Sequence, residues 1–266
     1  MVSIIMSVYN PKKVFLKKSI DSVCYQSFRE FEFIIVNDGS SYDITQFLYK
    51  YKCRNSHIIL IDNSKNIGLT NSLNIALKHV RGIYIARIDA DDLWHPQKLE
   101  KQIGFLEKNP SVGLVGTMYE EIDEFGNVIG PQRVPFLETD KDIKRNIIKF
   151  NPFFHSSVVF RKEILDTIGF YNEKFKYAQD YEYWVRIMTK YKVYNIPEVL
   201  AYRRYTSNMI SIKKEKLQRY YAFRAKLKAF ELLKVPKYQM VYLIKDLLFL
   251  STPLSIINFL RKWKRT

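Results

Sequence analysis

The chain has 266 residues, of which 47% are hydrophobic and 15% aromatic, and 43 Lys and Arg against 27 Asp and Glu give a formal net charge of +16. This apolar content excludes a disordered chain, and the length suits one large or two small domains with a well-buried core. The two cysteines, Cys24 and Cys53, are too few for a disulfide scaffold and favour a reducing compartment. Residues 1–9 lack the basic start of a secretory signal, so we expect a cytoplasmic protein.

The excess positive charge is concentrated near the C-terminus. Residues 211–266 contain 14 Lys and Arg against 3 Asp and Glu, whereas residues 1–210 contain 29 and 24. A nucleic-acid-binding domain is expected to carry its charge beside its chemistry. The nearly balanced first part therefore predicts no nucleic-acid partner, and a basic nucleic-acid-binding protein stays the non-enzymatic alternative.

Short apolar runs alternate with segments of helical period over the first 115 residues. Residues 2–8 predict a strand, and Asn10 and Pro11 predict the cap and first turn of a helix. Further strands are expected at 31–36, 57–61, 84–88 and 112–115, and further helices at 44–51, 69–79 and 96–108. This alternation predicts an α/β fold, a Rossmann-like, mostly parallel sheet with helices on both faces.

The pattern changes after residue 116. We predict a turn at 123–126, a helix at 139–150 capped by Thr139, a strand at 156–160, a short helix at 162–168 and an amphipathic helix at 180–191. Asp180 stands at the start of the last of these helices, where a side chain that merely caps the helix is the plain alternative to a functional one.

Polar residues collect in four loops that follow the strands of the first half. The loops are residues 7–10 (Ser-Val-Tyr-Asn), 37–40 (Asn-Asp-Gly-Ser), 63–68 and 89–92 (Asp-Ala-Asp-Asp). Ligands of such sheets bind beyond the carboxyl ends of the strands, so the four loops together predict a site at that rim. Each loop alone is also what turns and helix caps use.

Asp89 and Asp91 are separated by one residue on a turn that follows an apolar strand. Two carboxylates in this arrangement suit Mg²⁺ or Mn²⁺ shared with substrate phosphates. The chain has neither a P-loop nor a GxGxxG motif. A nucleotidyltransferase is the alternative enzyme, but it should have a basic phosphate-binding loop near the first strand, and residues 6–11 have none.

The order of these motifs resembles glycosyltransferase family 2. The motifs lie at residues 3–10, 36–40, 66–74 and 89–92, and continue at 151–161, 179–184 and 202–203. The resemblance spans roughly residues 2–211 and implies a GT-A fold, a nucleotide-sugar donor that is usually UDP-linked, a divalent cation (Mn²⁺ or Mg²⁺) and inversion at the anomeric carbon. It also implies a catalytic domain at 1–210, with a nucleotide-binding half at 1–116 and an acceptor-binding half at 117–210.

The resemblance implies roles for individual residues of the donor site. Ser7 and Tyr9 would hold the base, Tyr9 by stacking, and Asp38 would accept a hydrogen bond from the uracil imide. Asp91 would be the main metal ligand, and Asp89 would assist through the ribose or a metal-bound water. The remaining donor-binding candidates are Asn10, Asn66 and Gly68.

By the same resemblance Asp180 is the catalytic base. Gln179 stands where the family often has Glu, and the loss of a like charge should leave the pKa of Asp180 lower than in an acidic pair. Tyr205 stands where many relatives have His. Candidates for the acceptor or diphosphate side are His155, Trp184 and Arg203, with a structural hydrogen bond as the alternative role of His155.

Residues 211–266 predict a basic amphipathic helical tail. Its uncharged stretch, 247–260, is 14 residues long and too short to cross a bilayer, whereas the Arg-Lys-Trp-Lys-Arg run at 261–265 is typical of interfacial helices. We therefore expect a peripheral protein on the inner face of the cell membrane, with a glycan or lipid-linked acceptor of bacterial surface polysaccharide. The alternative is a helical hairpin packed on the catalytic domain or on a second subunit, and the sequence indicates no oligomeric state.

Overall fold

The computed structural model describes residues 1–54, 56–206 and 214–252. The strands in these ranges are β1 (Val2–Val8), β2 (Phe31–Asn37), β3 (Ile58–Asp62), β4 (Tyr84–Arg87), β5 (Leu93–Trp94), β6 (Val112–Ile122), β7 (Val128–Pro131), β8 (Val159–Arg161) and β9 (Lys192–Arg204). The helices are α1 (Lys13–Cys24), α2 (Tyr42–Arg54), α3 (Leu69–Lys78), α4 (Lys98–Lys108), α5 (Asp140–Asn146), α6 (Ile164–Thr167), α7 (Gln179–Ile187), α9 (Glu215–Leu232) and α10 (Met240–Ser251), with short 3₁₀ turns η1 (His155–Ser157) and η2 (Lys237–Gln239).

One sheet, in the order β3-β2-β1-β4-β8-β6-β9-β5, joins the strands of both halves, and β7 pairs with the end of β6. Strands β3, β2, β1 and β4 are parallel to one another, and β6 is parallel to β9. Strand β8 runs antiparallel between β4 and β6. The mostly parallel α/β sheet is confirmed, and β6 runs straight through the predicted division at residue 116.

Alternate side chains of the strands enter two hydrophobic cores, one on each face of the sheet. Helices α1, α2 and α4 cover the face that carries Ile4, Met6 and Phe33. Helices α3, α5 and α7 cover the face that carries Ile5 and Ile34. The period-two alternation of buried residues thus fixes which helices lie on which face.

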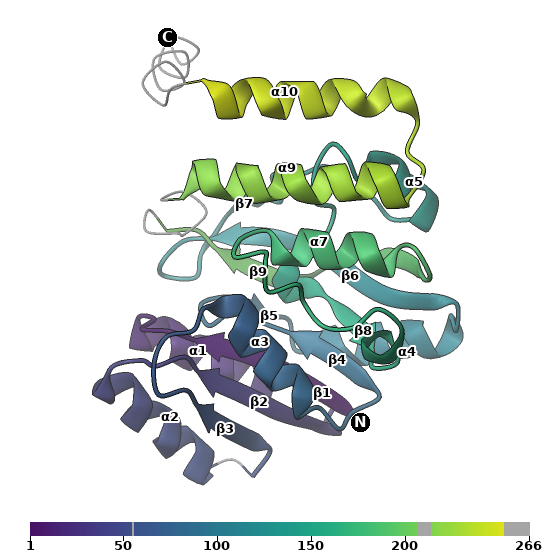
Figure 1. Ribbon diagram of the computed structural model, residues 1–266. Helices are drawn as coiled ribbons and strands as arrows, with labels where there is room; N and C mark the ends of the chain where they lie inside the picture. The colour runs from purple at the N-terminus through teal and green to yellow at the C-terminus, as the bar shows by residue number, and fades with distance from the viewer. Residues whose placement is uncertain (55, 207–213, 253–266) are drawn as a thin grey trace.

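Beyond α7 the chain adds two further helical layers. Figure 1 shows α9 lying along α7, and α10 lying outside α9. Ala225 and Ala229 of α9 and Leu243 of α10 are buried in the same core as α7. In the described ranges no helix is long and apolar enough to cross a membrane. The predicted run at 261–265 lies outside the described residues.

Several predicted boundaries are wrong for local reasons. Helix α1 begins at Lys13, not at Pro11, because Asn10 adopts a left-handed backbone with φ of 44°. The strand predicted at 156–160 begins at Val159, because the preceding residues form η1. Helix α5 ends at Asn146, although Thr139 caps it as predicted and accepts from the Asp142 backbone N–H. Strand β9 was not predicted at all.

Candidate active site

The first two rim loops are tied together through Asn10. The Asn10 backbone N–H donates to Ser40 Oγ at 3.1 Å, and the Ser41 N–H donates to Asn10 Oδ1 at 2.7 Å. Asn10 therefore joins the loops 7–10 and 37–40 by hydrogen bonds and is not the helix cap predicted for it. Tyr9, which precedes Asn10, is 55% exposed, and Ser7 is half-buried near the end of β1. The structure therefore presents a solvent-facing aromatic ring at the rim, next to an anchored backbone.

Asp38 holds the second and third rim loops together. Its Oδ1 accepts from Asn63 Nδ2 at 3.0 Å and from the Ile67 N–H at 2.9 Å, and its Oδ2 accepts from the Gly68 N–H at 2.9 Å. A carboxylate oxygen has about two lone-pair sites, so Oδ1 is filled and Oδ2 has one site left. With only 1% of Asp38 exposed, any base contact must use that single Oδ2 site.

Glycines allow these loops to meet. Gly39 has φ of +69°, and a Cβ on it would lie 2.5 Å from the backbone carbon of Lys65. Gly68 has φ of +92° where it turns its N–H toward Asp38. Asn66, two residues before Gly68, is exposed at the rim. Three of the four predicted loops, 7–10, 37–40 and 63–68, therefore converge, and the close approach at residue 39 is one that only glycine permits.

A buried arginine engages the first aspartate of the Asp89–Asp92 turn. Arg87, at the end of β4, is 1% exposed, and its two terminal nitrogens bond both oxygens of Asp89, one at 2.6 Å. Such a bidentate ion pair is strong and directional. Ser156 of η1 accepts from the Asp89 backbone N–H at 3.0 Å and donates to the Asp92 carboxylate. The turn is thus held from beneath by residues of β4 and η1.

Asp91 and Asp92 are crowded carboxyl groups. Burial and the nearby charge of Asp89 raise the pKa of Asp91 to about 6, and burial with the charge of Asp91 raises the pKa of Asp92 well above its usual range. Arg204, which is fully buried, offsets part of this charge: its N–H donates to Asp92 Oδ1 at 3.0 Å and its Nε to the Asp91 carbonyl at 2.9 Å.

This donor set fits a divalent cation through Asp91. Within the described residues the Asp91 carboxylate has no side-chain hydrogen-bond partner, and a cation would relieve the crowding that raises its pKa. Both oxygens of Asp89 already accept hydrogen bonds from Arg87, so Asp89 is less available than Asp91 as a metal ligand. The described ranges contain no group of three or more His, Cys, Asp or Glu that could hold a metal. A cation here would need other oxygen ligands, such as substrate phosphates.

Asp180 lies in the first turn of α7, and the helix cap is Ala178, so Asp180 is not the capping residue. Asn151 Nδ2 donates to Asp180 Oδ2 at 2.8 Å, and the Phe153 N–H donates to Asn151 Oδ1 at 3.2 Å, which fixes the orientation of the amide. Burial raises the pKa of Asp180, while the charge of Arg87 acts in the opposite direction. The same buried guanidinium therefore acts on Asp89 and on Asp180.

The acceptor-side candidates have different surroundings. His155 is 8% exposed, and its Nε2 lies 2.9 Å from the Tyr171 hydroxyl, which matches the structural role given as an alternative. Burial, together with the charge of Arg87, lowers the pKa of His155. Trp184 is fully buried, so it packs beneath the site and cannot touch an acceptor in this conformation. Arg203 is partly exposed and lies 3.7 Å from Glu121, so its diphosphate contact stays a prediction.

Sequence reasoning missed Arg87, Ser156 and Arg204, all buried polar residues that hold the Asp89–Asp92 turn. Arg87 carried a signal, since a charged residue at the end of an apolar strand and two residues before Asp89 is unusual. Arg204 could have been distinguished from Arg203 only by the alternation of side chains along a strand that was not predicted.

Solved structures with the same architecture define the fold. The TM-score is 0.65 with residues 1-349 of S. aureus TarS in complex with UDP-GlcNAc, at 19% identity, over 92% of this chain and 79% of that one. It is 0.69 with the mannosyltransferase PcManGT from Pyrobaculum calidifontis in complex with GDP-Man and Mn²⁺, at 16% identity, over 99% and 79%. Another S. aureus TarS structure has a longer chain, of which this chain covers 43%. The fold is therefore that of a GT-A glycosyltransferase.

Sequence comparisons establish the family. The family Glycosyl transferase family 2 matches residues 3–169. An uncharacterized glycosyltransferase of Methanocaldococcus jannaschii is 36% identical over 232 residues, 84% of this chain and 78% of its own. The amylovoran biosynthesis glycosyltransferase AmsE of Erwinia amylovora is 32% identical over 213 residues, 79% of each chain. The chain belongs to glycosyl transferase family 2, and its relatives include an enzyme of polysaccharide biosynthesis.

Proposed function

We propose that the protein is an inverting, metal-dependent glycosyltransferase that moves a hexose or N-acetylhexosamine from a nucleotide sugar to a hydroxyl of a glycan or lipid-linked acceptor in surface-polysaccharide synthesis. UDP is the expected nucleotide. The observation that carries the proposal is Asp180, an ionisable group fixed by Asn151 and acted on by the buried Arg87 that also holds Asp89.

The reaction requires one displacement. The acceptor oxygen forms a bond to the anomeric carbon while its proton passes to the Asp180 carboxylate. The bond from that carbon to the diphosphate oxygen breaks, and the electron pair leaves with the diphosphate. Because attack and departure occur on opposite faces, the anomeric configuration inverts. Asn151 keeps one oxygen of Asp180 occupied and orients the carboxylate for this proton transfer.

The donor would be held by the rim loops. Tyr9 would stack on the base, and the remaining acceptor site of Asp38 Oδ2 would take the imide N–H. A divalent cation, when bound, supplies positive charge to the leaving diphosphate. Asp91 would hold that cation, while Arg87 keeps Asp89 in place. The complexes of TarS with UDP-GlcNAc and of PcManGT with GDP-Man and Mn²⁺ support this choice of ligands.

We further propose that the protein acts on the inner face of the membrane. Helix α10 carries an exposed apolar stripe at the spacing i, i+1, i+4, i+7 and i+8, formed by Met240, Val241, Ile244, Leu247 and Leu248, each 49–64% exposed. A helix with this face, in a basic segment, suits an anionic lipid surface. Cosedimentation with phosphatidylglycerol vesicles should fall for Ile244→Glu with Leu248→Glu and stay unchanged for Phe125→Glu, an exposed apolar control. Equal binding by wild type, the double variant and Phe125→Glu would refute the proposal.

Nucleotide release from a donor panel tests the catalytic proposal. Purified full-length protein is incubated with UDP- and GDP-linked hexoses and N-acetylhexosamines, with Mn²⁺, Mg²⁺ or EDTA, in water as the surrogate acceptor. We expect slow release of UDP from at least one donor, loss of release in EDTA, and an initially β sugar from an α-linked donor by NMR. An initially α sugar would refute inversion, and release unaffected by EDTA would refute metal dependence. Failure to bind or hydrolyse any donor would refute the whole assignment.

A further inference from the structure

A pocket of about 230 Å³ lies between α7 and α9 beside Asp180. The loop before η1 and the start of α7 form one wall, and α9 forms the other. Its lining residues are Phe150, Asn151, Ala178, Asp180, Tyr181, Gln218, Ala222 and Lys226. Since Gln218, Ala222 and Lys226 are spaced by four residues, they lie on one face of α9. The pocket is thus bounded on one side by the predicted base and on the other by the C-terminal extension.

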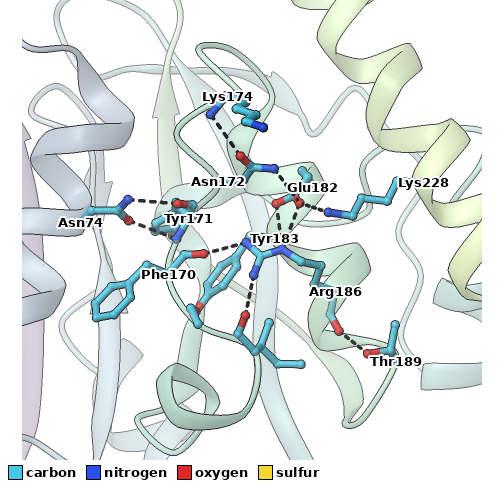
Figure 2. A network of polar contacts seen from close by, with 12 residues as sticks. Asn74, Phe170, Tyr171, Asn172, Lys174, Glu182, Tyr183, Arg186, Thr189 and Lys228 are labelled. Atoms are coloured by element: carbon cyan, nitrogen blue, oxygen red, sulfur yellow. Dashed lines mark hydrogen bonds and ion pairs between the residues drawn. The ribbon is translucent and has the colours of Figure 1, made fainter.

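Helix α9 is firmly attached to the catalytic part. Figure 2 shows Glu182 of α7, which is fully buried, between Arg186 of its own helix and Lys228 of α9. Lys226 Nζ lies 2.6 Å from Asp246 Oδ2 and so ties α9 to α10. Ala225 and Ala229 are both fully buried and allow close packing of α9. The α9 wall of the pocket is therefore a built part of the fold.

The chemistry of the pocket suits a neutral polar ligand. The positive charge of Lys226 is matched by Asp246, and Asp180 adds a carboxylate, so the pocket offers no free cation for an anionic ligand. Phe150 and Tyr181 supply apolar surface, and Asn151 and Gln218 supply amides. A sugar ring has the same division, with C–H faces and hydroxyl edges. The volume equals that of about eight liquid waters, which suits a single ring.

Gln218 has an unmet hydrogen-bonding requirement. Its Oε1 is buried and has no hydrogen-bond partner among the described residues. The terminal torsion of a Gln side chain is broad, so the amide can turn toward the pocket. A ligand hydroxyl would then donate to Oε1, and Ala222, one turn along α9, leaves the room for it.

We propose that this pocket receives the acceptor sugar, with its reacting hydroxyl at Asp180, and that Gln218 is a specificity-determining residue that bonds a non-reacting hydroxyl of the same ring. The proposal rests on the glycosyl transfer proposed above. It extends the acceptor site from residues 117–210 into α9. Acceptor choice would then depend on a helix outside the segment 3–169 that matches the family.

Binding of simple sugars tests this proposal without knowledge of the natural acceptor. The probes are methyl glycosides of glucose, galactose, mannose and N-acetylglucosamine, measured by ligand-observed NMR on the full chain with UDP and Mn²⁺. We expect wild type to bind at least one glycoside, Ala222→Leu to lose that binding because the new side chain fills the pocket, and Gln218→Met to weaken it about tenfold through one lost hydrogen bond. Leu227→Met, on the exposed side of α9, should match wild type.

The outcomes separate this inference from the enzymatic assignment. UDP affinity and the midpoint of thermal unfolding show whether each variant is folded with an intact donor site. Glycoside binding by Ala222→Leu and Gln218→Met equal to that of wild type, or no glycoside binding by wild type that binds UDP, would overturn the acceptor pocket alone. A wild-type chain that binds and hydrolyses no nucleotide sugar would instead overturn the proposed function.

Discussion

The substitution Asp180→Asn separates catalysis from folding. Asn has nearly the same shape as Asp and can still accept from Asn151 Nδ2, so the loop before η1 should keep its position. It cannot take a proton from the acceptor. Loss of a general base reduces rates by about 10²–10⁴, or roughly 3–5 kcal/mol in activation free energy. We expect a fall in kcat of this size with nearly unchanged nucleotide affinity.

The same substitution, which should abolish most of the activity, should not lower the stability of the fold. Burial raises the pKa of Asp180 in the folded chain above its value in the unfolded chain. The folded state therefore disfavours the ionised form, and the free energy of unfolding falls as pH rises from the unfolded pKa, about 3.9, through the raised folded pKa. Asn removes that penalty, although it exchanges a charge-assisted hydrogen bond for a neutral one. Asp180→Asn should therefore be at least as stable as wild type at pH 7, with the difference vanishing below pH 4.

Three measurements check the argument on one preparation. They are nucleotide release with the best donor of the panel, calorimetric titration with UDP and Mn²⁺, and urea unfolding at pH 7 and pH 4. The wild-type rate should also fall with decreasing pH at a higher pH than for an exposed Asp, because the base must be ionised. Residual turnover within tenfold of wild type would remove Asp180 as the base. If Asp180→Asn is less stable than wild type at pH 7 and the deficit is smaller at pH 4, the burial argument is refuted.

Three further substitutions test the surroundings of the site. Asp91→Asn should weaken Mn²⁺-dependent UDP binding by calorimetry at least about tenfold, and unchanged affinity would exclude it as a metal ligand. Arg87→Met should lower the free energy of unfolding by about 2–4 kcal/mol in urea, less than for a fully buried pair because Asp89 is 37% exposed, and a change below about 0.5 kcal/mol would contradict this. Lys98 is fully buried without a hydrogen bond among the described residues, and burial lowers its pKa. Lys98→Met should therefore stabilise the chain by about 1–3 kcal/mol at pH 7, with the gain shrinking toward pH 10 as the unfolded Lys deprotonates; a loss at pH 7 would refute it.

The first half of the fold was predictable because its strands are short, apolar and separated by amphipathic helices. Strand β9 was not, because its pattern is interrupted. Its register against β6 shifts between Thr117 and Met118, where Ile196 and Val199 are the successive partners. Pro197 and Glu198 therefore bulge out of the ladder, and the period of two is lost at that point. Pairing with a strand 80 residues away cannot be deduced from local spacing.

The site was predictable to the level of the loops that form it, but not to the level of its hydrogen bonds. The sequence offered Asp91 as the main metal ligand and Asp89 as an assisting one, but it gave no sign that Asp89 is bound by Arg87 while Asp91 has no side-chain partner among the described residues. That difference depends on which group is buried beneath the turn. Asn151 was part of a recognised motif, yet its contact with Asp180 joins residues 29 apart. Only the tertiary structure shows that it orients the base.

The basic C-terminal segment shows why net charge alone does not identify a partner. In the described part of the segment, Lys226 pairs with Asp246, Lys228 pairs with the buried Glu182, and Arg224 lies over a cluster of aromatic rings. Lys228 and Arg224 attach α9 to the catalytic part, and Lys226 ties α9 to α10, so these cations contribute to the fold and to the pocket beside the base. Attraction to an anionic surface must come from other cations and from the exposed stripe of α10. A charge reversal at Lys228 would therefore disturb the catalytic helix before it changed binding to lipid, and it is the wrong substitution with which to test the membrane proposal.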